Sequence, residues 1–436
     1  MAAAVHGLVY VPFVHRHVTT DTDAYVAAAH ALEHARYTTP LRASFYYTYP
    51  VGFFDLTGVP EGRGSAVFRA PEKQAFRTPG YPLALALVGG GGPGGSRYAV
   101  LVLQAVLLGL ATWLLALIVR RWWGPATALL AEAIYALDPY SKHYVTLVVT
   151  ETLATVVAVT CVYAFTRAWQ ERTPSWWAAT GALASALTLV RPVFVVAVPL
   201  VAVAATLRPS QRVRRGLAAV LAVGLLLVPW LAWTDHVTGK PVLSNWGEGF
   251  NLLLAAHGER LGHEAAEIES ERSFAAELAA SRRMAPTTRQ LLADPFVHPR
   301  YLRHADAQLR TQARSLYWRR LKHRPLEVVW ENLYRNYFLW TAHHDWYQPS
   351  GVQLLALQTL DWILLLLAGA GIVLALRRRG AAAAVAVFLV LYSITLSTHH
   401  VEARFSMPLR GFFLAYVAFA LAELARGRRL TTSRVA

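Results

Sequence analysis

The stretch RYAVLVLQAVLLGLATWLLALIV, residues 97–119, decides the fold class. No charged residue follows Arg97 within it, and a basic pair, Arg120 and Arg121, comes directly after it. A bilayer core of about 30 Å accommodates a helix of roughly 20 apolar residues. The stretch therefore predicts a transmembrane helix that ends in a basic loop.

Comparable apolar stretches recur along the chain. They predict further spans at residues 124–138, 145–166, 176–190, 193–207, 216–233, 353–376, 381–397 and 407–425. A weaker candidate covers residues 3–18, and it is short and contains three histidines. It is interpreted as a poor membrane helix, as a cleaved signal peptide, or as the remainder of a span that starts upstream of Met1. We expect an all-α polytopic membrane protein with about 10 transmembrane helices.

The composition agrees with a membrane protein. Of 436 residues, 55% are hydrophobic and only 16% are charged, whereas an ordinary soluble domain carries about 25% charged residues. The single cysteine, Cys161, excludes a disulfide bond within the chain and argues against a cysteine-based zinc site. Cys161 lies in a predicted span, where it is expected to pack as a small apolar side chain.

The positive charge of the chain is concentrated in short loops. The balance of 42 Lys and Arg against 26 Asp and Glu gives a net charge of +16, which would suit nucleic acid. The basic clusters, however, fall in loops on one side of the predicted spans, and such loops are normally cytoplasmic. The clusters are Arg120–Arg121, Arg167 with Arg172, Arg208 to Arg215, Arg377 to Arg379 and Arg426 to Arg429. We therefore expect a cytoplasmic C-terminus and no nucleic-acid partner.

This topology leaves two long segments outside the membrane. The expected units are a doubtful first span at 1–18, a first outer loop at 19–96, transmembrane helices at 97–233, a helical second outer loop at 234–350, and transmembrane helices with a cytoplasmic tail at 351–436. In the second outer loop, residues 263–283 and 299–322 predict surface helices. The second of these is strongly basic, and we expect it to face headgroups or solvent, or to hold an anionic acceptor.

Three carboxylates lie at the predicted outer boundary of the membrane. Asp21 and Asp23 open a helical pattern in the first outer loop, where aspartate is a preferred N-cap. A carboxylate just outside the bilayer can also act as a general base or bind a metal. Glu151 lies inside a predicted span, and an acid at that depth usually faces a partner or a site. Capping accounts for the aspartates when they are taken alone, whereas Glu151 favours a functional interpretation.

Arg77 belongs to the sequence Phe-Arg-Thr-Pro-Gly-Tyr-Pro, residues 76–82. The prolines and the glycine predict a turn where the chain returns to the membrane. An arginine at this boundary often extends its side chain to the headgroups. Its planar guanidinium is equally suited to bind a phosphate through two hydrogen bonds.

Two histidine groups lie at predicted membrane boundaries, His343–His344–Asp345 and His399–His400. They resemble metal ligands only loosely, because adjacent residues of a helix point in different directions. Histidine and tryptophan at this depth more often lie in the headgroup belt. Should a divalent metal be bound, we expect Asp21, Asp23 and one of these histidines as ligands.

Eight short motifs occur in an order that resembles the GT-C membrane glycosyltransferases. They are Asp21 with Tyr25, Arg-x-Pro-Gly-Tyr-Pro (77–82), Leu-Asp-Pro-Tyr (137–140), Thr-Glu (150–151), Leu-Val-Arg-Pro (189–192), Val-Pro-Trp (228–230), Gly-Lys-Pro-Val-Leu-Ser…Gly-Phe-Asn-Leu (239–252) and Glu-Ala-Arg-Phe-x-x-Pro (402–408). The resemblance covers residues 19–425 and is greatest to the protein O-mannosyltransferases and aminoarabinose–lipid A transferases, a group similar to glycosyltransferase family 39. Each motif is weak alone, and their common order makes the resemblance fairly specific.

The resemblance implies a donor sugar on a polyprenyl phosphate, used on the outer face of the membrane. It matches Asp21 to an aspartate that acts on the acceptor, Arg77 to a residue that contacts the lipid phosphate, and Glu151 to a second acid. The chain departs from the family at residues 231–236, where Leu-Ala-Trp-Thr-Asp-His replaces a common Arg-Asn, and in its short first span. The role of that loop and the start of the chain therefore stay open.

The chemistry of such a transfer calls for the same residue types. The acceptor must lose a proton to a carboxylate, and the departing phosphate must be stabilised by cations. We predict Asp21 and Glu151 as catalytic residues. The predicted substrate-binding residues are Asp23, Tyr25, Arg77, Tyr81, Lys142, His143, Arg191, Asn251 and Arg404. A single displacement without an enzyme nucleophile would invert the anomeric carbon.

We therefore expect a polyprenyl-phosphate-sugar-dependent hexosyl- or pentosyltransferase in the plasma or inner membrane, with its active site on the extracytoplasmic face. The acceptor would be a lipid, a protein or a polysaccharide. A secondary transporter of lipid-linked or anionic substrates is the alternative, although repeated halves with interrupted helices are not evident in the sequence. A further alternative is an enzyme similar to the O-antigen ligases, which would rely on arginine and histidine in a large outer loop.

Overall fold

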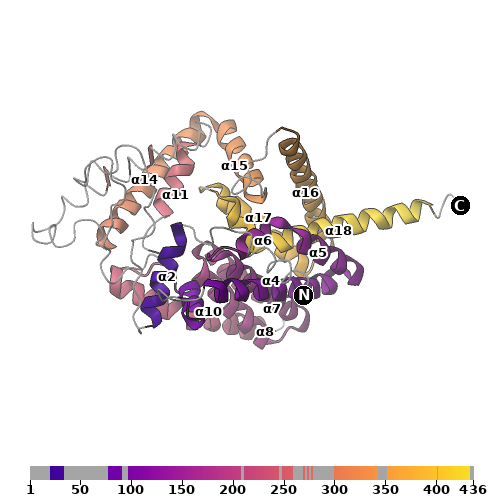
Figure 1. Ribbon diagram of the computed structural model, residues 1–436, viewed down its shortest axis with the longest axis horizontal. Coiled ribbons are helices and arrows are strands. Elements are labelled where there is room, and N and C mark those ends of the chain that lie inside the picture. Colours follow the sequence, from indigo (N-terminus) through magenta and orange to yellow (C-terminus); the bar gives the residue numbers. More distant parts are fainter. Residues whose placement is uncertain are drawn as a thin grey trace, which may run out of the picture.

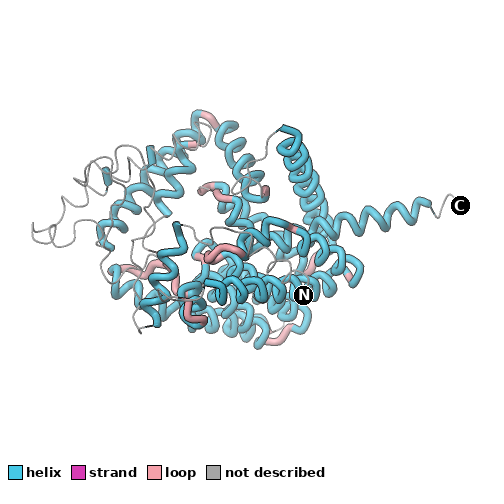
Figure 2. The backbone as a smooth tube through the Cα atoms, viewed as in Figure 1, coloured by secondary structure: helices cyan, strands magenta, loops and turns pink. Residues whose placement is uncertain are grey.

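The computed structural model describes residues 20–33, 77–90, 97–207, 211–244, 248–258, 299–341, 351–399 and 401–432, together with residues 269, 270, 273, 276 and 277. The predicted first span, most of the predicted helix 263–283, and His343, His344, Asp345 and His400 lie outside these ranges. The described residues form helices joined by short loops, without a strand among them (Figure 2). The predicted all-α class is confirmed.

The helices follow the order that the apolar stretches predict. They are α2 (Thr20–Glu33), α3 (Gly80–Leu87), α4 (Arg97–Trp123), α5 (Pro125–Leu137), α6 (Pro139–Val145), α7 (Glu151–Glu171), α8 (Pro174–Val190), η4 (Pro192–Val196), α9 (Ala197–Thr206), α10 (Arg212–Thr238), α11 (Glu248–His257), α14 (Pro299–His323), α15 (Pro325–Trp340), α16 (Gly351–Arg378), α17 (Ala381–Ser397), η6 (Ala403–Ser406) and α18 (Met407–Thr432). Figure 1 shows α11 and α14 together at one end of the molecule and the last turns of α18 projecting at the other.

Five of the described helices are long and apolar enough to cross a bilayer. They are the spans Tyr98–Trp123, Glu151–Glu171, Arg212–His236, Leu355–Arg378 and Arg404–Gly427. Shorter apolar helices cover Pro125–Leu137, Pro192–Thr206 and Ala381–Ser397. The protein is therefore a multi-pass membrane protein, and the total of about 10 spans stays a prediction.

The start of α7 differs from the predicted span at 145–166. The apolar run begins at Val145, but α6 ends there and residues 146–150 form a turn, so that α7 begins at Glu151. The sequence does not reveal this turn, because residues 146–150 are mostly β-branched and include no glycine or proline. As a result, Glu151 lies in the first turn of a helix and not one turn inside it.

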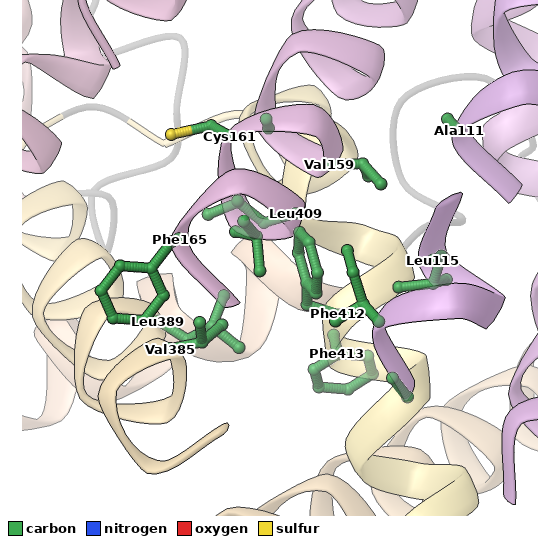
Figure 3. Close-up of a cluster of buried hydrophobic side chains, with 14 of the residues drawn as sticks. Ala111, Leu115, Val159, Cys161, Phe165, Val385, Leu389, Leu409, Phe412 and Phe413 are labelled. Carbon is green, nitrogen blue, oxygen red and sulfur yellow. The ribbon is translucent and has the colours of Figure 1, made fainter. Parts of the chain in front are cut away.

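The core lies between α4, α7, α17 and α18. Figure 3 shows Leu115, Val159, Leu389 and Phe412 from these four helices directed toward one another. The most apolar window of α18 is 83% buried, against 22% for those of α10 and α16. Helix α18 is therefore the centre of the bundle, and α10 and α16 present most of their surface to lipid.

Glycines allow two pairs of spans to pack closely. A Cβ atom at position 181 in α8 would clash with the carbonyl oxygen of Ala219 in α10. A Cβ atom at position 371 in α16 would clash with that of Tyr416 in α18. Small residues at helix contacts are typical of membrane proteins, where close approach of the backbones supplies much of the packing.

Candidate functional site

Glu151 and Arg191 form a buried ion pair where α7 begins and α8 ends. The guanidinium of Arg191 lies 2.8 Å from Glu151 Oε1, and the two side chains are 11% and 2% exposed. The hydroxyl of Thr150 donates to the other carboxylate oxygen at 3.3 Å. Helix α8 ends before Arg191 because Pro192 disfavours a helical conformation in the residue that precedes it. The extended backbone at Arg191 then directs the chain into η4.

The N-terminal helices bring aromatic side chains and a further guanidinium to this pair. The rings of Tyr25 and Tyr81 meet edge to face with their centroids 5.1 Å apart. The guanidinium of Arg77 lies over the ring of Tyr25 at 5.0 Å. Tyr25 is also close enough to Arg191 to act on its charge. We call Tyr25, Arg77, Tyr81, Glu151 and Arg191 the Arg191 cluster.

The segment that carries Arg77 is packed onto the end of α8. The hydroxyl of Thr78 donates to the carbonyl of Val190 at 3.4 Å. Gly80 lies so close to α8 that a Cβ atom there would be 2.7 Å from the carbonyl oxygen of Leu189. The turn predicted by the prolines and the glycine thus fixes Arg77 beside Arg191.

The side chain of Gln104 in α4 forms hydrogen bonds that hold the same region in place. The hydroxyl of Tyr81 donates to Gln104 Oε1 at 3.0 Å. The amide nitrogen of Gln104 donates to the carbonyls of Val145 and Leu147 at 2.9 and 2.8 Å. Burial, followed by the charge of Glu151, raises the pKa of Tyr81 well above its usual value. Tyr81 therefore keeps its proton and remains the donor to Gln104.

The segment 402–406 closes the opposite side of Arg191. The guanidinium of Arg191 lies 5.3 Å from the ring of Phe405. Arg404 is close enough to act on the charge of Arg191 and forms an ion pair with Glu402. The side chains of Arg404 and Glu402 are 26% and 32% exposed. Three guanidinium groups therefore meet here with two carboxylates among the described residues, which is an environment that favours an added anion.

The first turn of α2 is tied to the turn that leads to Glu151. The hydroxyl of Thr22 donates to the carbonyl of Val148 at 3.0 Å. Asp21 and Asp23 flank Thr22 in the sequence, and their carboxylates lie outside the described part of the chain. The backbone of the two predicted acids is thus placed next to the Arg191 cluster.

Lys142 lies in a different group of side chains. It is completely buried, and its ammonium donates to the carbonyl of Tyr135 at 3.1 Å and to the hydroxyl of Ser141 at 3.0 Å. Burial lowers the pKa of Lys142 to about 8, against the opposing effect of Asp138. A buried ammonium bonded to the protein is placed to hold α5 and α6 together.

Asp138 links this lysine to the centre of the bundle. One carboxylate oxygen accepts from the backbone N–H of Ser141 at 3.0 Å, and the other lies 3.4 Å from the guanidinium of Arg410 in α18. Arg410 also donates to the carbonyl of Trp340 at 2.5 Å. We call Tyr135, Asp138, Lys142, Trp340 and Arg410 the Asp138 cluster.

The other predicted site residues are not brought to the Arg191 cluster by any described contact. His143 packs edge to face on Tyr144 at 5.2 Å, and burial lowers its pKa to about 4. Asn251 is half-buried in α11, which packs along α14. The Nδ1 atom of His399 lies 3.0 Å from the carbonyl of Thr395. Among the described side chains no three His, Cys, Asp or Glu could hold a metal, and the carboxylates of the predicted ligands Asp21 and Asp23 are not among these side chains.

Three residues that shape these clusters were not predicted as site residues. Gln104 is a lone amide inside the apolar stretch 97–119, and that isolation is a usable signal for a buried polar contact. Asp138 and Glu402 belong to two of the eight motifs, yet nothing in the sequence shows which side chain each one meets. The pairing of Asp138 with Arg410 and of Glu402 with Arg404 is known only from the fold.

The fold and the site together define an all-helical, multi-pass membrane protein with an arginine-rich, aromatic-walled site at one end of its bundle. Comparison with known proteins identifies the type of bundle. Residues 83–233 match the family model described as dolichyl-phosphate-mannose-protein mannosyltransferase. A search of characterised protein sequences finds no match.

Solved structures with a similar fold include the oligosaccharyltransferase of Archaeoglobus fulgidus. Its apo form matches with a TM-score of 0.54 at 14% identity over 99% of this chain and 51% of that one. Its complex with an inhibitory peptide and a dolichol-phosphate matches with a TM-score of 0.54 at 13% identity over the same shares. ArnT from Cupriavidus metallidurans bound to undecaprenyl phosphate has a TM-score of 0.38 at 14% identity over 96% of this chain and 76% of that one.

The chain thus has the fold of the GT-C membrane glycosyltransferases, as its motifs predicted. It spans about half the length of the archaeal oligosaccharyltransferase that it matches. The matched residues 83–233 include Glu151, Arg191, Gln104 and Asp138.

Proposed function

We propose that the protein transfers a sugar from a polyprenyl-phosphate donor to an acceptor on the extracytoplasmic face of the plasma or inner membrane, with inversion at the anomeric carbon. The observation that carries the proposal is the meeting of Arg77, Arg191 and Arg404 around Glu151 at one end of a GT-C bundle. A phosphate whose lipid tail stays in the bilayer must be bound by cations at the membrane boundary. The site supplies such cations at that position.

The charge of the opposite end of the bundle supports the proposed orientation. Arg120–Arg121, Arg172, Arg377–Arg379 and Arg426 lie at the helix ends farthest from the Arg191 cluster along α4, α7, α16 and α18. Short loops rich in arginine are normally cytoplasmic. The Arg191 cluster would then be extracytoplasmic, where polyprenyl-linked sugars would be used.

The residues divide into two roles. Arg77 and Arg191 would stabilise the charge that develops on the departing phosphate, and the aromatic rings of Tyr25 and Phe405 would hold these guanidinium groups in position. Asp21, next to Thr22 at the cluster, would accept the acceptor proton, with Glu151 holding Arg191.

The test is transfer by purified protein in proteoliposomes, with a panel of polyprenyl-phospho-sugars and mass analysis of the products. Arg191→Met should lower the transfer rate by roughly 10²–10³-fold, the effect of losing one donor to a developing anion. The matched control is Arg378→Met, which removes an exposed arginine paired with Glu423 at the other end of the bundle. Equal rates for the two variants would disprove the role of Arg191.

Asp21→Asn separates the proposed base from the phosphate site. It should abolish transfer and leave the binding of polyprenyl phosphate unchanged, because the phosphate would contact the arginines. Full activity of this variant would remove Asp21 from the mechanism. Counter-flow of a labelled lipid-linked or anionic substrate, without a glycosylated product from any donor, would favour the transporter and contradict the proposal.

A further inference from the structure

Helix α15 exposes a continuous apolar face on the same end of the bundle as the Arg191 cluster. Leu326, Val329, Trp330, Leu333 and Tyr334 are 84%, 51%, 60%, 57% and 48% exposed. Their spacing of three and four residues places them on one side of the helix. Soluble proteins seldom expose so large an apolar and aromatic face to water.

The opposite face of α15 is fixed in the protein. Val328, Arg335 and Leu339 are almost completely buried. The guanidinium of Arg335 donates to the carbonyl of Ser397 at the end of α17 at 3.0 Å and to that of Ala255 in α11 at 2.5 Å. The helix cannot turn its apolar face inward without breaking these bonds. The exposed face therefore belongs to the folded protein.

The C-terminal end of α15 continues into the lipid-facing surface of a span. The ring of Tyr337 stacks on Trp362 of α16 with the centroids 4.9 Å apart. Trp362, Ile363 and Leu366 of α16 are 55%, 48% and 71% exposed, and the helix is one of the least buried spans. The apolar face of α15 and the lipid-facing surface of α16 thus meet at one aromatic contact.

The N-terminal end of α15 carries a basic rim. Arg319, Lys322, His323 and Arg324 are all exposed at the corner where α14 passes into α15. Trp318 lies beside them and is 68% exposed. Cations next to tryptophan and leucine are the composition of a helix that lies in the boundary between headgroups and acyl chains. The charge is complementary to anionic phospholipids.

We propose that α15 lies in the membrane interface, with its face Leu326–Tyr334 at the headgroup–acyl boundary of the leaflet on the side of the Arg191 cluster, and that the basic corner 319–324 binds anionic lipid headgroups. This surface is separate from the proposed sugar-transfer site and does not depend on it. Because Arg335 and Arg320 of this region bind the carbonyls of Ala255 and Ala256, the lipid contact also positions α11.

The test is electron paramagnetic resonance of spin labels in reconstituted full-length protein. The lone cysteine is first removed as Cys161→Ala, and single cysteines are introduced as Trp330→Cys and Leu333→Cys. Ala307→Cys, exposed on α14 about 16 Å along the helix from Trp318, reports a water-exposed position. Leu366→Cys in α16 reports the acyl region. Collisions with oxygen and with a water-soluble nickel complex measure the depth of each label.

Labels at positions 330 and 333 should collide with oxygen several times more, relative to nickel, than the label at position 307. Their depth should fall between those of positions 307 and 366. An oxygen-to-nickel ratio equal to that at position 307 would show a water-exposed face and overturn the proposal. Exclusion of both reagents would show that a protein covers the face, and would overturn it as well.

The basic corner is tested with two vesicle compositions. The label at position 330 should lie deeper in vesicles of phosphatidylglycerol and phosphatidylcholine than in phosphatidylcholine alone. The triple variant Arg319→Gln/Lys322→Gln/Arg324→Gln should lose this difference, since it removes the exposed cations and keeps the apolar face. An equal depth in both compositions for the parent protein would disprove the binding of anionic headgroups.

Discussion

Two of the buried arginine–carboxylate pairs in the described part of the chain, Glu151–Arg191 and Asp138–Arg410, lie at the same end of the bundle and have different surroundings. Glu151 and Arg191 are 2% and 11% exposed, and Asp138 and Arg410 are 6% and 4% exposed. In the Asp138 cluster the other hydrogen bonds of Arg410 and Lys142 are accepted by the carbonyls of Trp340 and Tyr135 and by the hydroxyl of Ser141. Around Arg191 the neighbours are rings and further guanidinium groups.

The difference shows how a binding site and an anchor are distinguished. An ion pair whose other hydrogen bonds end on the backbone joins helices, and it leaves little capacity for a ligand. An ion pair surrounded by additional partly exposed cations retains attraction for an added anion. Burial of the pair alone does not separate the two cases, because both pairs are almost completely buried.

The largest expected effect contrasts the two carboxylates directly. Asp138→Asn should destabilise the protein by about 3–5 kcal/mol, because it leaves the buried charges of Arg410 and Lys142 without their carboxylate. Glu151→Gln should lose less stability and abolish sugar transfer, since Arg191 keeps its contact with Phe405. Thermal unfolding in detergent and transfer in proteoliposomes measure the two effects.

The control for this contrast is Glu423→Gln. It is the same change of carboxylate to amide, in an exposed pair with Arg378 at the other end of the bundle. Exposed pairs contribute about 1 kcal/mol or less, so its unfolding temperature should stay near that of the parent. If Asp138→Asn has the same unfolding temperature as the control and Glu151→Gln has a lower one, the assignment is reversed. The Glu151–Arg191 pair would then be the anchor.

A smaller effect is expected where the Arg191 cluster is attached to α4. Tyr81→Phe removes the donor to Gln104 and leaves a buried amide oxygen without that partner, which costs about 1–3 kcal/mol. It should also weaken donor binding, because without the hydrogen bond to Gln104 the ring of Tyr81 is held less firmly against the ring of Tyr25, which lies under Arg77. Thermal unfolding and the donor concentration at half-maximal rate measure the two results.

Tyr334→Phe is the control for this change. It removes a hydroxyl from a half-exposed tyrosine on α15, so both measurements should stay close to those of the parent. If Tyr81→Phe also leaves both unchanged, Gln104 is held by the carbonyls of Val145 and Leu147 alone, and the cluster does not depend on Tyr81.

The sequence predicts the helical class well because an apolar stretch of span length seldom forms anything except a membrane helix. The stretches at 381–397 and 97–119 became α17 and α4 with nearly the predicted bounds. The start of α7 was wrong by six residues, because the turn at 146–150 arises from the docking of α2 and α4 and not from local turn residues.

The site was predicted less completely, for a physical reason. The sequence predicts Arg77, Arg191 and Arg404 as cations near the membrane boundary, and the structure groups them. It predicts Lys142 on the same grounds, yet the ammonium of Lys142 is directed to the carbonyl of Tyr135. A sequence gives the depth of a side chain along its helix, but the direction around the helix axis depends on neighbours that only the fold brings together.

The smallest expected effect concerns His143, which follows Lys142 in α6. Burial lowers the pKa of His143 from 6.5 to about 4. As the pH falls from about 6.5 to about 4, the unfolded chain therefore binds a proton that the folded protein does not bind, and the parent loses stability.

The variant His143→Asn should not suffer this loss of stability. The unfolding temperature of the variant relative to the parent should thus rise as the pH falls through this window. The difference in unfolding free energy should change by at most about 1.4 kcal/mol per pH unit. The matched control is His323→Asn, which removes a histidine that is exposed on α14. A difference that stays constant with pH would place His143 in contact with water, and would move it from the anchoring region of the Asp138 cluster toward the open region around Arg191.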